Sequence, residues 1–417
     1  MKTMKQIYLE EILMKKALLF VTAVTFALLL TSSVLVPVAY AQESGAQAVV
    51  GMQDVVVMAA ARTQAQTQAD INAYWTPERL LSAKPMEVHP EEVGADGFPI
   101  ANQVPTQEAP SVFVGGAAPS VQIGNKASKV LVPEGFQLEA EPESGVGPLA
   151  TSSFGAYFTT LRVFPDAATV TYPYSTAGQL FFTDPRTGGN FVCTASVLRL
   201  RVLVTAGHCV AHGSTTAANR YFYSNWMFVP SENNGAAPNG TWTWSLAATR
   251  NEWYNNGSVP NQQDVGMLVM VDQNIRGGGP FKIGQITGYL GYEYCTGTNC
   301  GNPPIAKNNL TIIGYPCNLD SCTRMEQTNA QTFKSGGSNT WIYGSVMRGG
   351  ASGGPWIQDF GVAPAGAPAG LLGNNFVEAV TSYGPVSTTP MYLGASAFDA
   401  RFNSLLSTVC SSHAGNC

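Results

Sequence analysis

After Thr151 the chain repeats short runs of β-branched and aromatic residues, each separated from the next by Gly, Asn or Pro. Runs of this length, bounded by turn residues, predict β-strands, and many of them in succession are typical of a sandwich or a barrel. The expected strands cover 158–164, 178–183, 191–204, 221–229, 241–246, 265–271, 310–315, 341–346 and 377–383. The pattern therefore predicts an all-β domain over 151–417.

One helix is expected close to the C-terminus. Its apolar positions recur at helical spacing: Phe398, Phe402, Leu405, Leu406 and Val409. Ser396 is the expected N-cap, and Asp399 follows it three residues later. Because its apolar residues share one face, we expect this helix to dock on the β-strands.

The first 41 residues have the pattern of a secretory signal peptide. Two lysines precede the apolar stretch 17–30, and the small-x-small triplet Ala39-Tyr40-Ala41 follows it. The polar break at 31–33 leaves the apolar run short of the roughly 20 residues that a bilayer span needs. We expect a secreted protein, either extracellular or held in the periplasm or at the cell surface, without a stable membrane span. Met14 is an alternative start.

The segment 42–150 differs in composition from the rest of the chain. It holds no cysteine, and residues 42–147 carry 13 acidic and 5 basic side chains, against 12 and 13 in 148–417. It also lacks sustained strand alternation. We interpret it as a propeptide or acidic linker before the domain at 151–417, and a propeptide is a candidate inhibitor of that domain. A permanent disordered spacer is the alternative.

The charge and cysteine content narrow the class of protein further. The net charge is −5, which excludes the basic surface that nucleic acid binding requires. All eight cysteines follow residue 190, and export predicts disulfides. Three pairs lie close in sequence and leave a fourth: Cys295–Cys300, Cys317–Cys322, Cys410–Cys417 and Cys193–Cys209. With four histidines and no CxxC pair, we expect neither a metal nor another cofactor.

Two motif blocks carry the chemistry. The first, VTAGHC at 204–209, resembles the histidine motif of the trypsin/chymotrypsin-like serine protease superfamily, whose next cysteine pairs with one on the neighbouring strand. The second, GGASGGPW at 349–356, resembles the nucleophile loop of the same superfamily. The resemblance implies that His208 is the general base and Ser352 the nucleophile. Glycines in the loop would let the amides of Gly350 and Ser352 form an oxyanion hole.

A third residue, an acid between His208 and Ser352, is implied by the order of the superfamily's triad. The candidates are Asp264, Asp272 and Asp320. Asp264 begins an apolar strand, as the superfamily's aspartate does, so Asp264 is our choice. It would hold the histidine tautomer and stabilise the imidazolium.

The same serine loop also matches G-x-S-x-G, the nucleophile elbow of α/β-hydrolases. That fold would need Asp399 and His413 as the acid and base. Only 65 residues follow Ser352, without alternating strands and helices, and the histidine block would stay unexplained. A secreted esterase on another fold remains one alternative, and a catalytically inactive binding module is a second.

The resemblance covers the chain from Phe154 to Val409. It implies two antiparallel β-barrels with a C-terminal helix, and a monomeric secreted endopeptidase whose partners are protein or peptide substrates. The block 312–316, IIGYP, is similar to a strand end of bacterial glutamyl-endopeptidase-like members. In the pancreatic-type enzymes of the superfamily, the residue before the serine is an aspartate that pairs with the new N-terminal amine on activation. This chain has Ala351 at that position, so the resemblance implies that this activation switch is missing.

The resemblance also implies which residues form the substrate pocket. Val346 would form its base with Met347 beside it, and Ser382, Tyr383 and Gly384 would pair with the substrate backbone. The glutamate-specific branch has a histidine where this chain has Thr381. An apolar or small side chain is therefore the expected preference, with Arg348 as the feature that would favour an acid.

Overall fold

The computed structural model describes most of the chain from residue 48 onward. It covers residues 48–52, 54–59, 64–100, 110–123, 129–131, 157–298, 300, 305, 309–337, 340–361 and 375–417. The predicted signal peptide at 1–41 lies outside these residues. No helix in the described part of the chain is long and apolar enough to cross a membrane.

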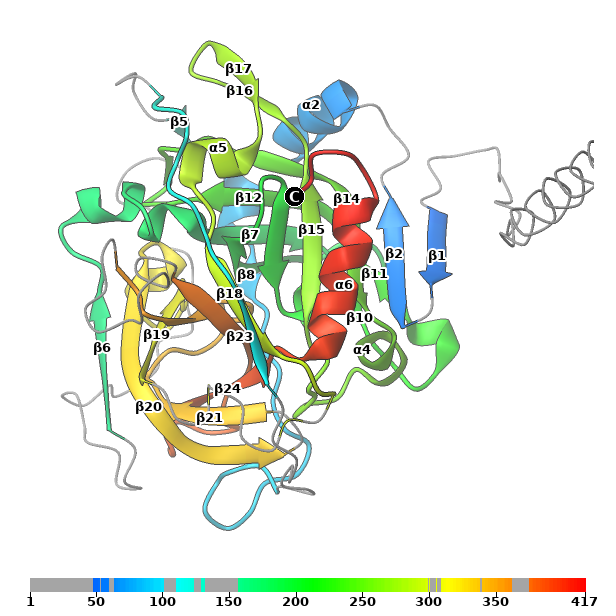
Figure 1. Cartoon of the computed structure of the whole chain (residues 1–417), viewed down its shortest axis with the longest axis vertical. Helices are drawn as coiled ribbons and strands as arrows, with labels where there is room; N and C mark the ends of the chain where they lie inside the picture. The colour runs from blue at the N-terminus through cyan, green and yellow to red at the C-terminus, as the bar shows by residue number, and fades with distance from the viewer. Residues whose placement is uncertain are drawn as a thin grey trace, which may run out of the picture. The chain divides into compact units, whose positions relative to one another are not determined.

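Six antiparallel strands form a first barrel (Figure 1). They run in the order β14-β12-β7-β8-β9-β15, and pairing of β15 with β14 closes the barrel. Alternation packs large apolar side chains inside it, among them Phe182, Trp226, Phe228 and Leu268, all completely buried. The strands are β7 (Ala177–Thr183), β8 (Asn190–Val197), β9 (Val202–Thr205), β12 (Ser224–Pro230), β14 (Trp242–Arg250) and β15 (Gly266–Met270).

A second closed barrel follows in the chain. Its order is β19-β20-β21-β24-β23-β22, and β22 pairs back with β19. Ile312, Tyr343, Trp356 and Leu393 belong to its core. The strands are β19 (Asn309–Gly314), β20 (Glu326–Gly337), β21 (Thr340–Gly344), β22 (Pro355–Gln358), β23 (Phe376–Tyr383) and β24 (Tyr392–Ala397).

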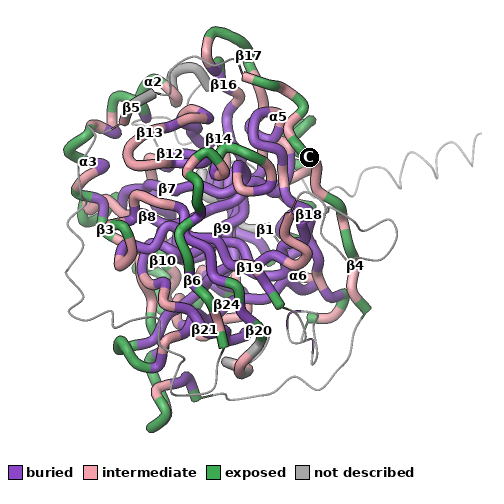
Figure 2. The backbone as a smooth tube through the Cα atoms, turned by 90° about the vertical axis from the view of Figure 1, so that its left-hand side faces the viewer, coloured by how far each residue is buried: buried purple, intermediate pink, exposed green. Residues whose placement is uncertain are grey.

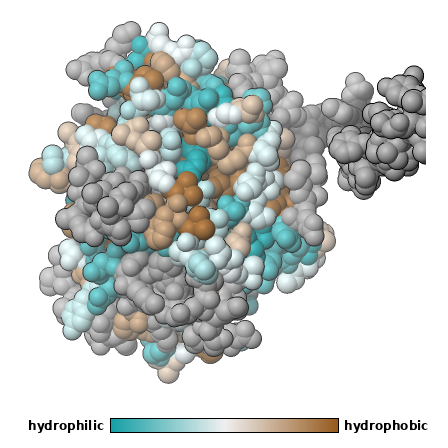
Figure 3. Space-filling view, in the orientation of Figure 1, coloured by the Kyte–Doolittle hydropathy of each residue, from teal (hydrophilic) through white to brown (hydrophobic). Residues whose placement is uncertain are grey.

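The helix α6 (Ala400–Ser411) ends the chain, and Phe402, Leu405, Leu406 and Val409 bury its apolar face. Its N-cap is Asp399, whose carboxylate accepts from two backbone amides. The expected cap, Ser396, was wrong: it lies in β24, one element earlier. Two antiparallel barrels and a C-terminal helix confirm the predicted fold class. On the side of the molecule that Figure 3 shows, hydrophobic and hydrophilic residues are mixed.

The N-terminal region contains elements that the sequence did not predict. The hairpin β1 (Ala48–Met52) and β2 (Val55–Ala59) extends the first barrel at β14, and β4 (Ser111–Val114) pairs with β18 (Gly291–Cys295). Residues 47–417 form one compact unit. The boundary expected near 150 therefore lies inside one compact unit. Figure 2 shows buried residues in the N-terminal region as well. The predicted removal of 42–150 stays a prediction.

The remaining elements are short. On the N-terminal side they are α2 (Gln64–Tyr74), α3 (Pro77–Leu81), β3 (Lys84–Pro85), β5 (Lys129–Val130) and β6 (Phe158–Arg162). Further along they are β10 (Ala211–His212), β11 (Tyr221–Phe222), β13 (Ala236–Ala237), α4 (Asn251–Asn256), β16 (Gln273–Ile275), β17 (Gly278–Phe281) and α5 (Ile283–Thr287).

Disulfides join the same four pairs that the sequence analysis proposed: Cys193–Cys209, Cys295–Cys300, Cys317–Cys322 and Cys410–Cys417. The first links β8 to the turn after β9. It therefore fixes the turn that carries His208 to the wall of the first barrel.

Candidate active site

His208 lies in a single 3-10 turn at the end of β9, where the strand leaves the first barrel. Its ring is buried, with 2% of the residue exposed. Nδ1 is 2.7 Å from Oδ2 of Asp264, and the backbone amide of His208 donates to Oδ1 of the same carboxylate at 2.8 Å. Two contacts to one carboxylate fix both the ring and its backbone.

Asp264 reaches this position because it precedes β15, which pairs with β9 in antiparallel register. Gly266 lies opposite Thr205, so the end of β9 and the start of β15 meet. Asp264 is completely buried and also accepts a hydrogen bond from the Ser382 hydroxyl at 2.6 Å. The carboxylate thus makes three polar contacts and has no exposed surface.

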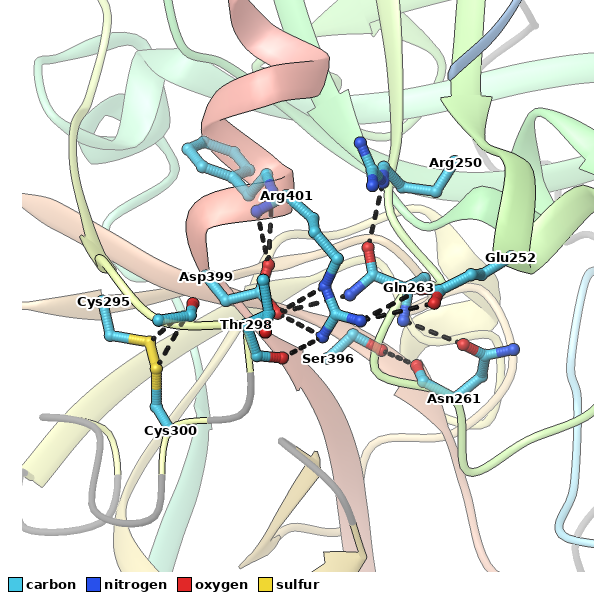
Figure 4. A network of polar contacts seen from close by, with 12 residues as sticks. Arg250, Glu252, Asn261, Gln263, Cys295, Thr298, Cys300, Ser396, Asp399 and Arg401 are labelled. Atoms are coloured by element: carbon cyan, nitrogen blue, oxygen red, sulfur yellow. Dashed lines mark hydrogen bonds and ion pairs between the residues drawn. A yellow bond between two sulfur atoms is a disulfide. The ribbon is translucent and has the colours of Figure 1, made fainter. Parts of the chain in front are cut away.

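A polar network holds the loop before Asp264 (Figure 4). Gln263 accepts from Arg250 Nε at 3.1 Å and donates to Asp399 at 3.4 Å. Ser396 donates to the carbonyl of Asn261 at 2.6 Å. Since these contacts come from β14, from β24 and from the N-cap of α6, both barrels and the C-terminal helix position the loop.

Arg401 extends the same network on its outer side (Figure 4). Its guanidinium binds the Asp399 carboxylate at 2.6 Å and Glu252 at 3.2 Å, and it also donates to the Thr298 carbonyl. Asp399 is only 1% exposed, and a buried carboxylate needs a compensating charge. Arg401 and the helix N-terminus that Asp399 caps provide it.

Ser352 lies on the loop before β22, and this loop packs directly against the turn that carries His208. Its carbonyl accepts from the amide of Thr194 at 2.8 Å. A Cβ placed on Gly353, which has φ +79°, would lie 1.9 Å from Thr205 Oγ1 and 2.8 Å from the amide of Ala206. Only glycine permits both the backbone conformation and this close approach.

The two amides of the predicted oxyanion hole are available. Gly350 has φ +95°, and its carbonyl accepts from Thr194 Oγ1 at 2.8 Å. Among the described residues, the amides of Gly350 and Ser352 donate to no other group. A loop of this kind offers two free donors to an anionic oxygen.

The hydroxyl of Ser352 does not donate to His208. It donates instead to the carbonyl of Met86, at 3.0 Å. Nε2 of His208 is buried without a hydrogen-bond partner in the described part of the chain. The acceptor of the Ser352 hydroxyl, Met86, thus comes from the N-terminal region.

The predicted pocket residues are only partly brought together. Ser382 contacts Asp264, and Gly384 contacts the N-terminal segment through its amide, which donates to the Val88 carbonyl at 3.3 Å. Thr381 accepts from the Trp356 indole at 2.9 Å, so its hydroxyl is occupied. Met347 and Tyr383 are packed in hydrophobic clusters. Val346 is half-buried.

The other acids proposed for the triad have different partners. Asp272 forms a bidentate ion pair with Arg201, and Asp320 forms one with Arg162. Asp399 caps α6, and His413 is exposed in the tail after that helix. The acid and base that an α/β-hydrolase would need are therefore not paired with each other.

One group among the described residues has metal-ligand atoms close together: Cys193, His208 and Cys209, within 4.8 Å. The two sulfurs form a disulfide with each other. Since a disulfide offers no thiolate, this group lacks the donors of a zinc site.

The chain is similar to several proteases. No family model matches it. An extracellular metalloprotease of Bacillus subtilis (strain 168) is 26% identical over 172 residues, which are 40% of this chain and 48% of that protein. The chain thus spans about half the length of the curated relative it matches.

Two solved structures are similar in fold. Protease Anisep from Arthrobacter nicotinovorans has a TM-score of 0.45 at 23% identity, covering 57% of this chain and 96% of that one. A Glu endopeptidase has a TM-score of 0.44 at 18% identity, covering 61% and 97%. At these TM-scores the fold assignment rests on the two closed barrels of the chain itself.

Sequence reasoning missed several residues that shape the site. Thr194 bridges the serine loop to β19, since it also accepts from the Tyr315 amide at 3.0 Å. Trp253 packs its ring against the His208 ring, with centroids 6.1 Å apart. No local motif marks either residue. The segment 84–89 carried one readable signal, because prolines at 85 and 90 favour extended backbone.

Proposed function

We propose that the chain is a secreted serine endopeptidase with Ser352, His208 and Asp264 as its triad. The observation that carries the proposal is the buried Asp264–His208 pair, 2.7 Å between Oδ2 and Nδ1, beside a glycine loop that presents a serine. The four disulfides and the signal pattern at 1–41 support export.

In the proposed reaction, Ser352 Oγ attacks the peptide carbonyl carbon while Nε2 of His208 takes its proton. Asp264 keeps the other ring proton on Nδ1 and stabilises the imidazolium. The amides of Gly350 and Ser352 bind the anionic oxygen of the tetrahedral intermediate. His208 then protonates the leaving amine as the C–N bond breaks, and water hydrolyses the acyl ester by the reverse proton route.

Three other functions are possible outcomes of the test. The name of the Bacillus subtilis relative suggests metal-dependent cleavage, but the disulfide at Cys193 and Cys209 removes the thiolate donors of the candidate group found among the described residues. A secreted esterase or an inactive binding module would share the fold without peptide hydrolysis.

A fluorophosphonate probe tests the proposal on the purified chain, with incubation until labelling is complete. We expect one adduct, mapped to Ser352 by mass spectrometry and absent in Ser352→Ala. Casein turnover, measured after the N-terminal segment 42–150 has been cleaved off and removed, should fall by about 10⁶-fold in Ser352→Ala and about 10⁴-fold in Asp264→Asn. A chelator that abolished casein turnover while the probe left the chain unmodified would favour the metal-dependent reading, and turnover of short-chain esters alone would favour an esterase.

A further inference from the structure

Residues 84–89 run across the proposed active site and contact both barrels. β3 (Lys84–Pro85) pairs with β8 of the first barrel in parallel register, and the amide of Met86 donates to the Val192 carbonyl at 3.0 Å. On the second barrel, the amide of Gly384 donates to the carbonyl of Val88 at 3.3 Å. Nδ1 of His89 lies 3.4 Å from the carbonyl of Gly384.

Both sides of this segment are anchored in hydrophobic packing. Before it, Trp75 and Leu80 are buried against Phe181 of the first barrel, and the Trp75 indole donates to the Asn225 carbonyl at 2.7 Å. After it, Phe98 is buried on the second barrel, with its ring stacked on Tyr392 at 5.0 Å. We call residues 75–98 the strap.

The strap lies directly on the proposed catalytic groups. A Cβ built on Gly349 would be 2.9 Å from both Pro85 and the Glu87 carboxylate, and one on Gly384 would be 3.3 Å from that carboxylate. Ser352 is 5% exposed and His208 is 2% exposed beneath it. A peptide substrate needs the same backbone groups and the same serine, so strap and substrate exclude each other.

The contact between strap and serine is not a reactive one. Hydrolysis requires the carbonyl oxygen at the amides of Gly350 and Ser352 and the carbonyl carbon at Oγ. Here the oxygen of Met86 accepts the proton of Ser352 Oγ, and neither amide binds it. The Ser352 hydroxyl therefore donates to the strap, and His208 Nε2 has no hydrogen-bond partner among the described residues.

We propose that the strap is a built-in inhibitor that covers Ser352 as a non-reactive peptide, so that the full chain is inactive until the strap leaves. This rests on the proposed function, because it assigns Ser352 as the nucleophile that is blocked. The occupant is this chain's own segment 84–89, held at both ends.

The test compares fluorophosphonate labelling rates in the unprocessed chain, whose length is checked by intact mass. Met86→Pro removes the amide that donates to Val192, and Gly349→Ala places a methyl group against Pro85 and Glu87. We expect both variants to label at Ser352 at least tenfold faster than the parent chain. Glu91→Ala, an exposed position just after the segment, is the matched control and should label at the parent rate.

Hydrogen exchange gives a readout that needs no activity. The Gly384 amide should exchange at least tenfold faster in Met86→Pro than in the parent chain, and should be unchanged in Glu91→Ala. Equal labelling of Ser352 in the parent and both variants would overturn the strap while leaving the proposed function intact. Absence of any label, with the Gly384 amide released in Met86→Pro, would instead overturn Ser352 as the nucleophile.

Discussion

Thr194, within β8, makes hydrogen bonds to the loop of Ser352 and to the end of β19. Its hydroxyl donates to the Gly350 carbonyl at 2.8 Å and accepts from the Tyr315 amide at 3.0 Å, and its own amide binds the Ser352 carbonyl. One side chain therefore fixes the oxyanion loop to both β8 and the end of β19.

Thr194→Val should remove both hydrogen bonds at nearly constant shape. Because a buried amide and a carbonyl lose a partner, we expect a loss of about 1–3 kcal/mol in the free energy of unfolding. In the chain freed of the strap, kcat should fall by about 10- to 100-fold through misplacement of Gly350. Thr194→Ser keeps the hydroxyl and should retain kcat, so equal losses in both variants would assign the effect to packing.

Glu232 gives a pH dependence that can be isolated. Burial raises its pKa from 4.5 to about 8, although the amide of Gly235 donates to its carboxylate at 2.6 Å. The folded state therefore keeps a proton that the unfolded state loses above pH 4.5, so this contribution to stability falls as pH rises from 4.5 to about 8.

In Glu232→Gln, which keeps an acceptor for Gly235, the free energy of unfolding should decline less between pH 5 and 8. Denaturant unfolding at four pH values measures it. Glu326 and Glu293, whose pKa values burial raises to about 8 and about 7, leave a residual slope. An unchanged slope would show that Glu232 is ionised in the folded protein.

At the residue scale, the site residues proposed from the sequence lie in local motifs, and the residues that it missed do not. The blocks around His208 and Ser352 are readable because the geometry of each depends on its immediate neighbours. Met86 has no such block: its role depends on a contact 266 residues away. Met347 is buried in the core of the second barrel, which its sequence context did not indicate, and its place in the substrate pocket stays a prediction.

Among the elements, the loop 261–264 depends most on distant partners. The side chain of Gln263 is buried between Arg250 and Asp399, one residue before Asp264 (Figure 4). Its side-chain amide thus connects the loop that carries Asp264, the proposed acid of the triad, to the N-terminus of α6.

Gln263→Leu should loosen this loop and misorient the Asp264 carboxylate. We expect kcat of the strap-free chain to fall by about 10- to 100-fold with KM unchanged, because the loss affects the chemistry and not substrate binding. Gln262→Leu changes the neighbouring glutamine, whose Oε1 has no partner among the described residues, and should retain activity. If both variants lost kcat equally, the backbone of the loop would be the cause.

The strands were predicted where they are rich in β-branched and aromatic residues. The run 191–204 proved to be two strands, β8 and β9, because a tight turn at 198–201 interrupts it without Gly or Pro. β20 (Glu326–Gly337) and β24 (Tyr392–Ala397) were missed, since the first is mostly polar and the second is rich in small residues. Each of these strands pairs with a neighbour on either side, and this pairing stabilises it although its residues have low intrinsic β-propensity.

At the scale of the whole molecule, the N-terminal region was expected to be separate and is instead paired with both barrels. β2 extends β14, β3 lies beside β8, β4 lies beside β18 and β5 pairs with β13. Composition could not reveal this, because the pairing partners lie more than a hundred residues further along the chain.

Cutting the chain should therefore not separate its parts at once. With a recognition site for a sequence-specific protease placed within 139–147, we expect the cleaved N-terminal fragment to co-elute with the rest at micromolar concentration. Size-exclusion chromatography with mass analysis of the peak measures this. Elution of the fragment alone would show that covalent continuity, and not strand pairing, holds it in place.

The covalent link between the strap and the rest of the chain has a consequence for how activity would begin. While the chain is intact, a tethered peptide acts at an effective concentration near millimolar, so even weak contacts keep the cleft occupied. One cut converts this into an ordinary bimolecular equilibrium, whose position depends on how much protein is present. Cleaved molecules would then stay inhibited at high protein concentration and become active on dilution. Dilution would therefore determine when hydrolysis begins.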